Sequence, residues 1–175
     1  MVEPGVVHSA RMPLGTDYAG QPCSLARTLE IVGERWTLLI VRDLFFGVRR
    51  FSDLQRHLDI PRAVLASRLA ALVEAGVVEP DPYRLTARGE ELWPAVHALM
   101  QWGERNEAPG GPRRVFAHAD CGTDLDAGGR CPSCGFVPHA GVLVMRPGPG
   151  ARPPQRDDAV SLALRKPRRR LEPLL

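Results

Sequence analysis

A histidine and three cysteines lie close together in the second half of the chain, in the segment HADCGTDLDAGGRCPSCG (residues 118–135). His118 and Cys121 are separated by two residues, and the same spacing separates Cys131 and Cys134. Two such pairs, each on a tight turn, can place one imidazole and three thiolates around one Zn²⁺ ion. A glycine follows the second member of each pair, and glycine readily adopts the left-handed backbone that such a turn needs. The spacing therefore predicts a metal site with four protein ligands.

The ligand types also indicate the metal and its role. Thiolates and imidazole favour zinc over magnesium or calcium, which prefer oxygen. Four protein ligands leave no open position, so the expected zinc is structural and not catalytic. Three alternatives stay open: His139 replaces His118 or Asp120 joins the set, the second cysteine pair is a redox dithiol, or no metal binds. The redox alternative lacks a surrounding βαβ pattern, and a segment this poor in large apolar side chains needs a crosslink or a metal to fold.

The residues before this segment predict a series of short helices. Apolar residues recur at helical spacing over residues 25–32 and again over 36–45, and Gly33 separates the two runs. A third helix is expected in RRFSDLQRHL, where Ser52 is the candidate N-cap. After a tight turn, Pro61 suits the first position of a fourth helix. Proline lacks an N–H, and an N–H at that position would have no partner within the helix.

A small hairpin and a long helix are expected to follow. The segment VVEPDPYRLT reads as two short strands joined by a corner at residues 79–82. Thr86 is the candidate cap of a long last helix, which Pro94 is expected to kink. The linker EAPGGP at residues 107–112 then ends the helix, since proline and glycine both interrupt helical structure.

The third and fourth helices together predict a helix-turn-helix, in which the second helix enters the major groove of DNA. Small residues on its outer face, Ala63 and Ala66, allow the helix backbone to approach the base edges. We expect Arg62, Ser67 and Arg68 to contact bases and phosphates. The residues expected to hold the DNA backbone are Arg49, Arg50, Ser52 and Arg84. The hairpin would be the wing, but its acidic corner EPDP predicts weak wing contacts.

Four blocks of sequence, in this order, carry a resemblance to a known family: CSLARTLEIVGERWTLLIVRDL, GVRRFSDLQRHL, IPRAVLASRLAALVEAGVV and YRLTARGEELWPAVHALMQWG. This part of the chain resembles the HxlR-type winged helix-turn-helix transcriptional regulators of bacteria. The resemblance implies a homodimer, held by its terminal helices, that presents two recognition helices to a pseudo-palindromic operator in double-stranded DNA. It also implies that Cys23 stands where some members sense thiol-reactive compounds. The alternative for Cys23 is a cysteine at a helix start that packs near the dimer interface and has no sensing role.

Length and composition limit the classes of protein that remain. The chain has 175 residues, of which 44% are hydrophobic, and a net charge of +3. That length suits one domain with an appendage. No apolar run reaches the roughly 20 residues of a membrane span, and the N-terminus lacks a signal-peptide pattern, so we expect no membrane association and a cytoplasmic protein. The sequence contains no carboxylate pair, Ser-His-Asp set or phosphate loop, so we expect that the protein is not an enzyme.

The expected architecture is mainly α, of the α+β class, and has four parts. These are a flexible arm (1–20), a winged helix-turn-helix domain (21–106), a zinc-ribbon-like module (113–145) and a basic tail rich in proline and arginine (146–175). We expect the tail to be disordered, and its RKPRRR cluster can add a salt-sensitive attraction to DNA. His57 and His97 are expected on solvated helix surfaces.

Together these features predict a sequence-specific DNA-binding regulator, a repressor by default, that a thiol-reactive or small-molecule signal releases. One alternative is a protein–protein adaptor that keeps the winged-helix scaffold and binds partners through the zinc module and the tail. The acidic wing favours the adaptor, and the arginines of the helix-turn-helix oppose it. The other alternative is an oxidoreductase that uses Cys131 and Cys134, which predicts a titratable thiol pair and no bound metal.

Overall fold

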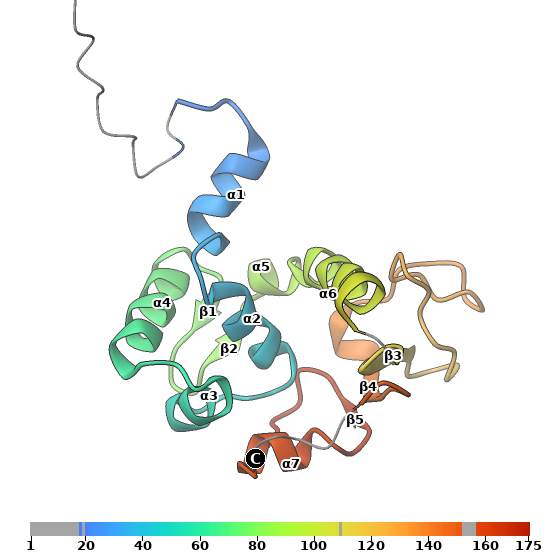
Figure 1. The fold of residues 1–175 in the computed structure, drawn as a ribbon. Coiled ribbons are helices and arrows are strands. Elements are labelled where there is room, and N and C mark those ends of the chain that lie inside the picture. The colour runs from blue at the N-terminus through green and yellow to red at the C-terminus, as the bar shows by residue number, and fades with distance from the viewer. Residues whose placement is uncertain (1–17, 19, 109, 152–156) are drawn as a thin grey trace, which may run out of the picture.

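The computed structural model describes residues 18, 20–108, 110–151 and 157–175. Most of the predicted N-terminal arm therefore lies outside the described residues. The first part of the fold consists of α1 (Ser24–Val32), α2 (Thr37–Phe45), α3 (Phe51–Leu58), α4 (Arg62–Glu74), β1 (Val78–Glu79), β2 (Arg84–Leu85), α5 (Ala87–Glu90) and α6 (Trp93–Glu107). The antiparallel pair β1–β2 forms the predicted hairpin beside α4 (Figure 1). This order of elements is that of a winged helix-turn-helix.

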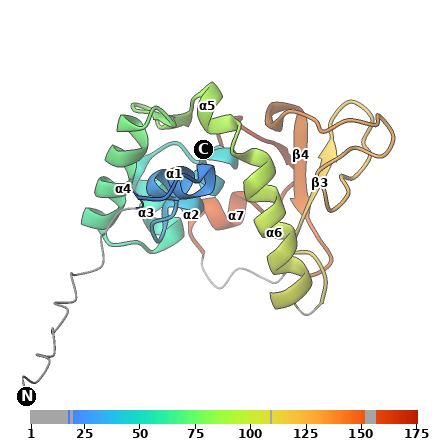
Figure 2. The ribbon, with the colours of Figure 1, turned by 90° about the horizontal axis from the view of Figure 1, so that it is seen from above.

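The second part of the fold is a small sheet with one short helix. It contains β3 (Arg114–His118), a 3₁₀ turn (Ala140–Val142), β4 (Leu143–Pro147), α7 (Ala159–Ala163) and β5 (Arg168–Arg169). The sheet is antiparallel, with β4 in the middle. Seen from above in Figure 2, α6 runs between the helices of the first part and the strands β3 and β4. The expected α+β class is therefore correct.

Three local predictions differ from the structure. The third helix is capped at Arg50 and not at Ser52, because the helix begins at Phe51. Pro61 is itself the residue before α4, one position earlier than predicted. The long last helix is broken into α5 and α6, so Pro94 lies in the first turn of α6 and does not kink a continuous helix. Proline is tolerated in a first turn because the N–H groups there have no partner within the helix.

The predicted cap at Thr86 is confirmed. Its hydroxyl accepts a hydrogen bond from the backbone N–H of Gly89 at 3.1 Å and donates to the carbonyl oxygen of Gly76 at 2.7 Å. One side chain thus fixes both the start of α5 and the end of the wing. The wing is positioned relative to α4 by the same contact, because Gly76 follows the last residues of that helix.

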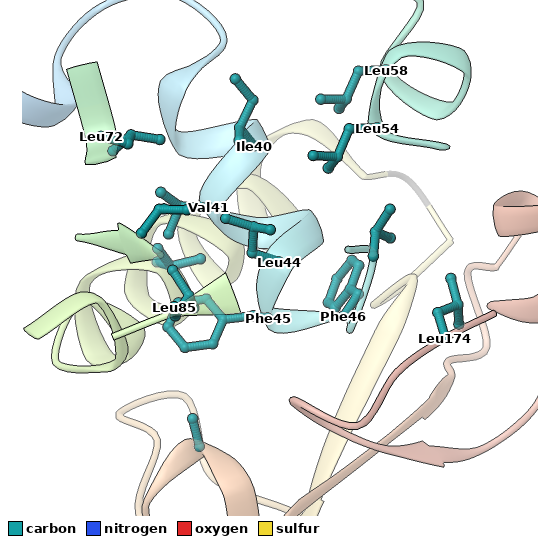
Figure 3. Packing of buried hydrophobic residues seen from close by; sticks show 14 of the residues in the cluster. Ile40, Val41, Leu44, Phe45, Phe46, Leu54, Leu58, Leu72, Leu85 and Leu174 are labelled. Atoms are coloured by element: carbon teal, nitrogen blue, oxygen red, sulfur yellow. The ribbon is translucent and has the colours of Figure 1, made fainter. Parts of the chain in front are cut away.

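The expectation of a disordered tail is wrong for residues 157–175. Asp158 caps α7 by accepting a hydrogen bond from the N–H of Ser161 at 3.0 Å. The apolar side chains of Val160, Leu164 and Leu174 are buried in the same core as the winged-helix residues. In Figure 3, Leu174 lies on the side of the cluster near Phe46. The tail folds because these three apolar side chains are buried, which its overall composition does not reveal.

The tail also inserts a charged side chain into the protein interior. Arg170 is 2% exposed, and its guanidinium carbon lies 3.4 Å from the centroid of the Trp93 ring. Three more rings surround it, those of Phe45, Phe46 and Phe116, at 4.8, 5.6 and 5.1 Å. We call Arg170 and these four rings the aromatic box. It joins α2, α6, β3 and the tail, so the two parts of the chain share one core.

His97 is buried and is not on a solvated surface as expected. Its ring packs against Trp93 and Phe116 with centroids 5.3 and 5.7 Å away. Burial lowers its pKa, and the positive charge of Arg170 lowers it further. His57 is half-buried, and its Nδ1 atom lies 3.2 Å from the hydroxyl of Ser161 on α7. Both histidines therefore help to attach other elements to the winged helix.

Candidate metal centre and nucleic-acid interface

His118, Cys121, Cys131 and Cys134 come together as predicted, and their ligand atoms all lie within 4.8 Å of one another. The Nδ1 atom of His118 is 3.5 Å from the sulfur of Cys121 and 3.4 Å from that of Cys134. The sulfurs of Cys121 and Cys131 are 3.4 Å apart. Ligand bonds of about 2.1 and 2.3 Å in a tetrahedron give edges of about 3.6 to 3.8 Å. The cluster therefore has the size of a tetrahedral site and could hold a metal ion.

Two glycine turns shape this cluster. Gly122 and Gly135 have φ angles of +70° and +75°, as the sequence predicted for the positions after each second ligand. The N–H of Gly122 donates to the carbonyl oxygen of His118, and that of Gly135 donates to the carbonyl oxygen of Cys131, both at 2.8 Å. A residue other than glycine is strained at these φ angles. Each turn thus folds back on its own ligand pair and directs both side chains to one point.

The surroundings of His118 decide between the alternative ligands. Its Nε2 atom faces the carboxylate of Asp120 at 3.5 Å, so Nδ1 is the nitrogen turned to the sulfurs. A carboxylate on the far ring nitrogen commonly orients a metal-bound histidine. His139 instead lies 3.0 Å from the carboxylate of Glu90 and accepts a hydrogen bond from the N–H of Gly141. His118 is therefore the fourth member of the cluster, and neither His139 nor Asp120 belongs to it.

The ionisation of the thiols also fits a cation at this point. Hydrogen bonds from the side chain and backbone of Thr123 lower the pKa of Cys121 to about 6. Cys134 shares a hydrogen bond with Cys121, and this contact, together with burial, raises its pKa to about 12. Three sulfurs this close therefore do not all become thiolates by themselves. A bound cation removes the conflict, because it stabilises every thiolate that coordinates it.

The helix-turn-helix is formed by α3, a turn at Asp59 with a φ angle of +53°, and α4. Helix α4 buries the side chains of Leu65, Leu69 and Leu72. On its opposite side, the predicted face with small side chains is exposed, with Arg62, Ala63, Ala66 and Ser67 in the solvent. The guanidinium carbon of Arg62 lies 5.0 Å from the centroid of the Phe51 ring, which holds the arginine beside the start of α3.

The other arginines predicted to meet DNA differ in their availability. Arg50, like Ser52, is exposed at the start of α3. Arg49 donates to the carbonyl oxygen of Leu171 at 2.7 Å, Arg68 pairs with Glu34 at 3.2 Å, and Arg84 pairs with Glu79 at 2.6 Å. Arg84 and Glu79 face each other in the hairpin register, so this pair removes the positive charge of the wing. Three of the arginines that the sequence predicted to contact DNA are therefore held by other groups of the protein.

Comparisons with known proteins agree with this architecture. Residues 31–110 match the family model for the HxlR-like helix-turn-helix. An HTH-type transcriptional regulator of Mycobacterium tuberculosis is 46% identical over 137 residues, which cover 73% of this chain and 87% of the relative. The chain belongs to the HxlR-like helix-turn-helix family. An HTH-type regulator of Escherichia coli, YtfH, is 36% identical over 108 residues, covering 56% of this chain and 85% of that relative.

A solved structure supports the same conclusion. The crystal structure of PA1607, a candidate transcription factor, matches 61% of this chain and 81% of its own at 36% identity, with a TM-score of 0.55. As an HxlR-like protein with relatives that are transcriptional regulators, the chain is a DNA-binding transcriptional regulator and not an enzyme. Among the described residues, no helix is long and apolar enough to cross a membrane.

Cys23, the cysteine at the sensing position implied by the family resemblance, is exposed at the N-cap of α1. It lies in a shallow depression with Gln21, Pro22 and Arg27. The guanidinium of Arg27 contacts Glu30 at 3.0 Å and the carbonyl oxygen of Tyr18. In the single chain the Cys23 thiol is therefore accessible to solvent.

Sequence reasoning missed Thr123 beside the metal cluster and Arg170 inside the core, and it considered Asp120 as a ligand when this residue instead lies behind His118. Asp120 behind His118 and Thr123 beside Cys121 both lie within two residues of a ligand, so their position in the sequence was an available signal. Arg170 gave no such signal. It is the last of three successive arginines, and only the three-dimensional packing distinguishes it from Arg169, which is exposed.

Proposed function

We propose that this HxlR-like protein is a sequence-specific regulator that binds a pseudo-palindromic operator as a homodimer. In the simplest mechanism it represses transcription by excluding RNA polymerase from the site. The observation that carries this proposal is the exposed face of α4, where Arg62, Ala63, Ala66 and Ser67 follow a tight turn. Small side chains permit close approach in the major groove, and Arg62 can donate two hydrogen bonds to guanine. Arg50 and Ser52, exposed at the start of α3, would contact the DNA backbone.

Exposed apolar side chains support the dimer. Leu25 on α1 is 64% exposed, and Leu99 and Trp102 on α6 are 56% and 57% exposed. Large apolar side chains grouped on a surface commonly mark an interface. Figure 1 shows that α1 projects from the body of the protein, where a second copy can reach it. These two helices are the terminal helices that the family resemblance assigns to the interface.

We propose that the metal is zinc and that its role is structural. Three thiolates and an imidazole form a ligand set that zinc prefers, and the four ligands leave no position for a substrate. When bound, the ion supplies a crosslink between the two glycine turns. His118 is the last residue of β3, so the site closes the end of the β3–β4 pair. Cys131, which is buried like His118, would connect the second turn to the same point.

We further propose that a signal releases the protein from DNA through Cys23. The exposed thiol at the start of α1 lies on the helix that we assign to the dimer interface. Modification of this thiol by an oxidant or electrophile would add bulk or charge at that interface. A change in the dimer would alter the spacing of the two α4 helices, on which operator binding depends.

The experiment that tests the DNA proposal is a footprint over DNA flanking the gene, at two salt concentrations. A protected palindrome that persists at the higher salt is expected. Arg62→Ala with Ser67→Ala is expected to remove the specific footprint, while Arg105→Ala, exposed on α6, leaves it intact. Size-exclusion chromatography with light scattering should show that all variants remain dimers. Protection that is diffuse and lost at higher salt would instead indicate non-specific charge attraction, and would favour the adaptor.

A further inference from the structure

The structure contains a cavity that the DNA-binding and metal sites do not use. It has a volume of about 570 Å³ and lies where α2, α6, α7 and the outer ends of β3 and β4 meet. Pockets for small molecules commonly measure about 300 to 1,000 Å³. The large apolar side chains that line it are Leu38, Leu39, Phe46, Val96, Leu99, Met100 and Leu164. Leu99 is also one of the exposed side chains that we assign to the dimer. A cavity of this size and lining can enclose a small apolar molecule.

Charged side chains at the cavity are mostly positive. Its lining includes Arg42, Arg113, Arg114 and Arg165, against two carboxylates, Glu104 and Glu107. Arg42 is paired with the carboxylate of Asp43 at 2.7 Å. The other three arginines outnumber the two glutamates, so the lining of the cavity has a net positive charge.

Arg114 shows the effect of this charge most clearly. It is half-buried and donates one hydrogen bond, at 2.6 Å, to the carbonyl oxygen of Leu164. Burial lowers the pKa of its guanidinium and the nearby charge of Arg42 lowers it further, whereas the carboxylates of Asp43 and Glu104 raise it in part. An anion beside Arg114 would offset the repulsion from Arg42 and form a charge-assisted hydrogen bond, which is stronger than a neutral one.

Glu104 adds a requirement for a hydrogen-bond donor. Its Oε2 atom is buried and has no hydrogen-bond partner among the described residues. A buried acceptor without a partner destabilises the folded state, because it has given up its hydrogen bonds to water and gained none in return. A hydroxyl group on a bound molecule would donate to it. The cavity thus presents an apolar wall, an anion-binding side and one acceptor for a hydroxyl.

We propose that this cavity binds a small apolar acid, with the carboxylate toward Arg113 and Arg114 and the apolar body against Phe46, Val96 and Met100. The site also touches the DNA-binding unit, because His57 of α3 lines it together with Ser161 of α7. A bound acid would therefore act as an effector, and this last step rests on the proposed DNA binding. Binding of the acid to the cavity does not depend on the proposed DNA binding.

The test uses 8-anilinonaphthalene-1-sulfonate, an aromatic anion whose fluorescence rises in apolar sites, as the probe on the purified full chain. Gly103 on α6 lines the cavity, and a Cβ added there meets no atom of a described residue within 4 Å. Gly103→Phe should therefore fill the cavity without disturbing its walls, and Gly103→Leu is a smaller second variant. Ala98→Phe, exposed on the same helix and outside the lining, is the matched control.

The expected result is saturable binding of one probe per chain, at least tenfold weaker in Gly103→Phe and unchanged in Ala98→Phe. Octanoate should displace the probe at a lower concentration than octanol. Arg113→Gln should reduce that difference, whereas Arg105→Gln on the exposed part of α6 should not.

Equal probe binding by the wild type and both Gly103 variants would overturn the proposal. So would octanol and octanoate that displace the probe equally, because the cavity would then select no acid. Absent probe binding combined with loss of the dimer in Gly103→Phe would also overturn it, since a partner subunit would then occupy the cavity. None of these readouts involves DNA, so failure of the operator footprint leaves this test unaffected.

Discussion

Substitution of Arg170 can separate two contributions to the stability of the aromatic box. One is the cost of burying a charge, and the other is the gain from its contacts with the four rings. The guanidinium is fully buried, and its three nitrogens have no hydrogen-bond partner among the described residues. Burial lowers its pKa well below the usual value of an arginine. Burying an unpaired ion costs several kcal/mol. Each desolvated ring returns up to about 2 kcal/mol through a cation–π contact. With four rings within 5.6 Å, the two effects nearly cancel.

This balance predicts different results for two substitutions. Arg170→Met removes the charge but keeps an apolar side chain against the rings, so the free energy of unfolding should change by less than about 1.5 kcal/mol. Arg170→Ala empties the space between Phe45, Trp93 and Phe116 and should cost about 3 to 5 kcal/mol. In a chain of this length that loss corresponds to a Tm lower by about 6 to 20 °C. Arg169→Met, at the exposed neighbour, should change stability by less than about 0.5 kcal/mol.

The assay is urea unfolding followed by tryptophan fluorescence and far-ultraviolet circular dichroism, with Tm as a second measurement. If Arg170→Met destabilises the protein as much as Arg170→Ala, the cation itself is required and the cancellation is wrong. If Arg170→Ala has no effect, the tail does not contribute to the core as described.

Three further predictions concern the metal, the thiol and the pH dependence. Cys134→Ser should lower the zinc content measured by mass spectrometry from one ion per chain to near zero, whereas His139→Ala should retain it; loss in both would return His139 to the ligand set. Cys23→Ser should abolish release from DNA by an electrophile without changing affinity in its absence, and a variant that still responds would place the sensor elsewhere. Burial and Arg170 hold the pKa of His97 below 6.5, so the folded protein keeps this ring neutral while the unfolded chain binds a proton as the pH falls below about 6.5. Stability should therefore decrease with acidification in that range, and His97→Gln should reduce the slope; an unchanged slope would assign it to other groups.

The sequence predicted those features of the fold and the site that depend on neighbouring residues. Helical spacing located α1 to α4, and the hydroxyl of Thr86 was recognised as a cap because capping needs only the next turn. The metal ligands were recognised for the same reason, since each pair and its glycine act within five residues. The helix break between α5 and α6 was missed because proline is compatible with either a kink or a first turn.

Features that depend on distant residues were not predictable. Arg49 is held by the carbonyl oxygen of Leu171, which lies 122 residues away, and Arg68 by Glu34. Composition alone indicated a disordered tail, because it does not show that Val160, Leu164 and Leu174 meet the same core. The pairing of Arg84 with Glu79 was not predicted either, although the two residues lie opposite each other in the predicted hairpin.

The shared core has a consequence for the order in which the protein folds during synthesis. The ribosome adds about 5 to 20 residues per second, so Arg170 is made roughly 6 to 25 seconds after Phe45. During that interval α2 and α6 can form, but the rings that later enclose Arg170 still face water or one another. The winged helix thus reaches its final packing only after the tail has left the ribosome. A cell that makes this regulator must keep those aromatic surfaces from aggregating until Arg170 has been made.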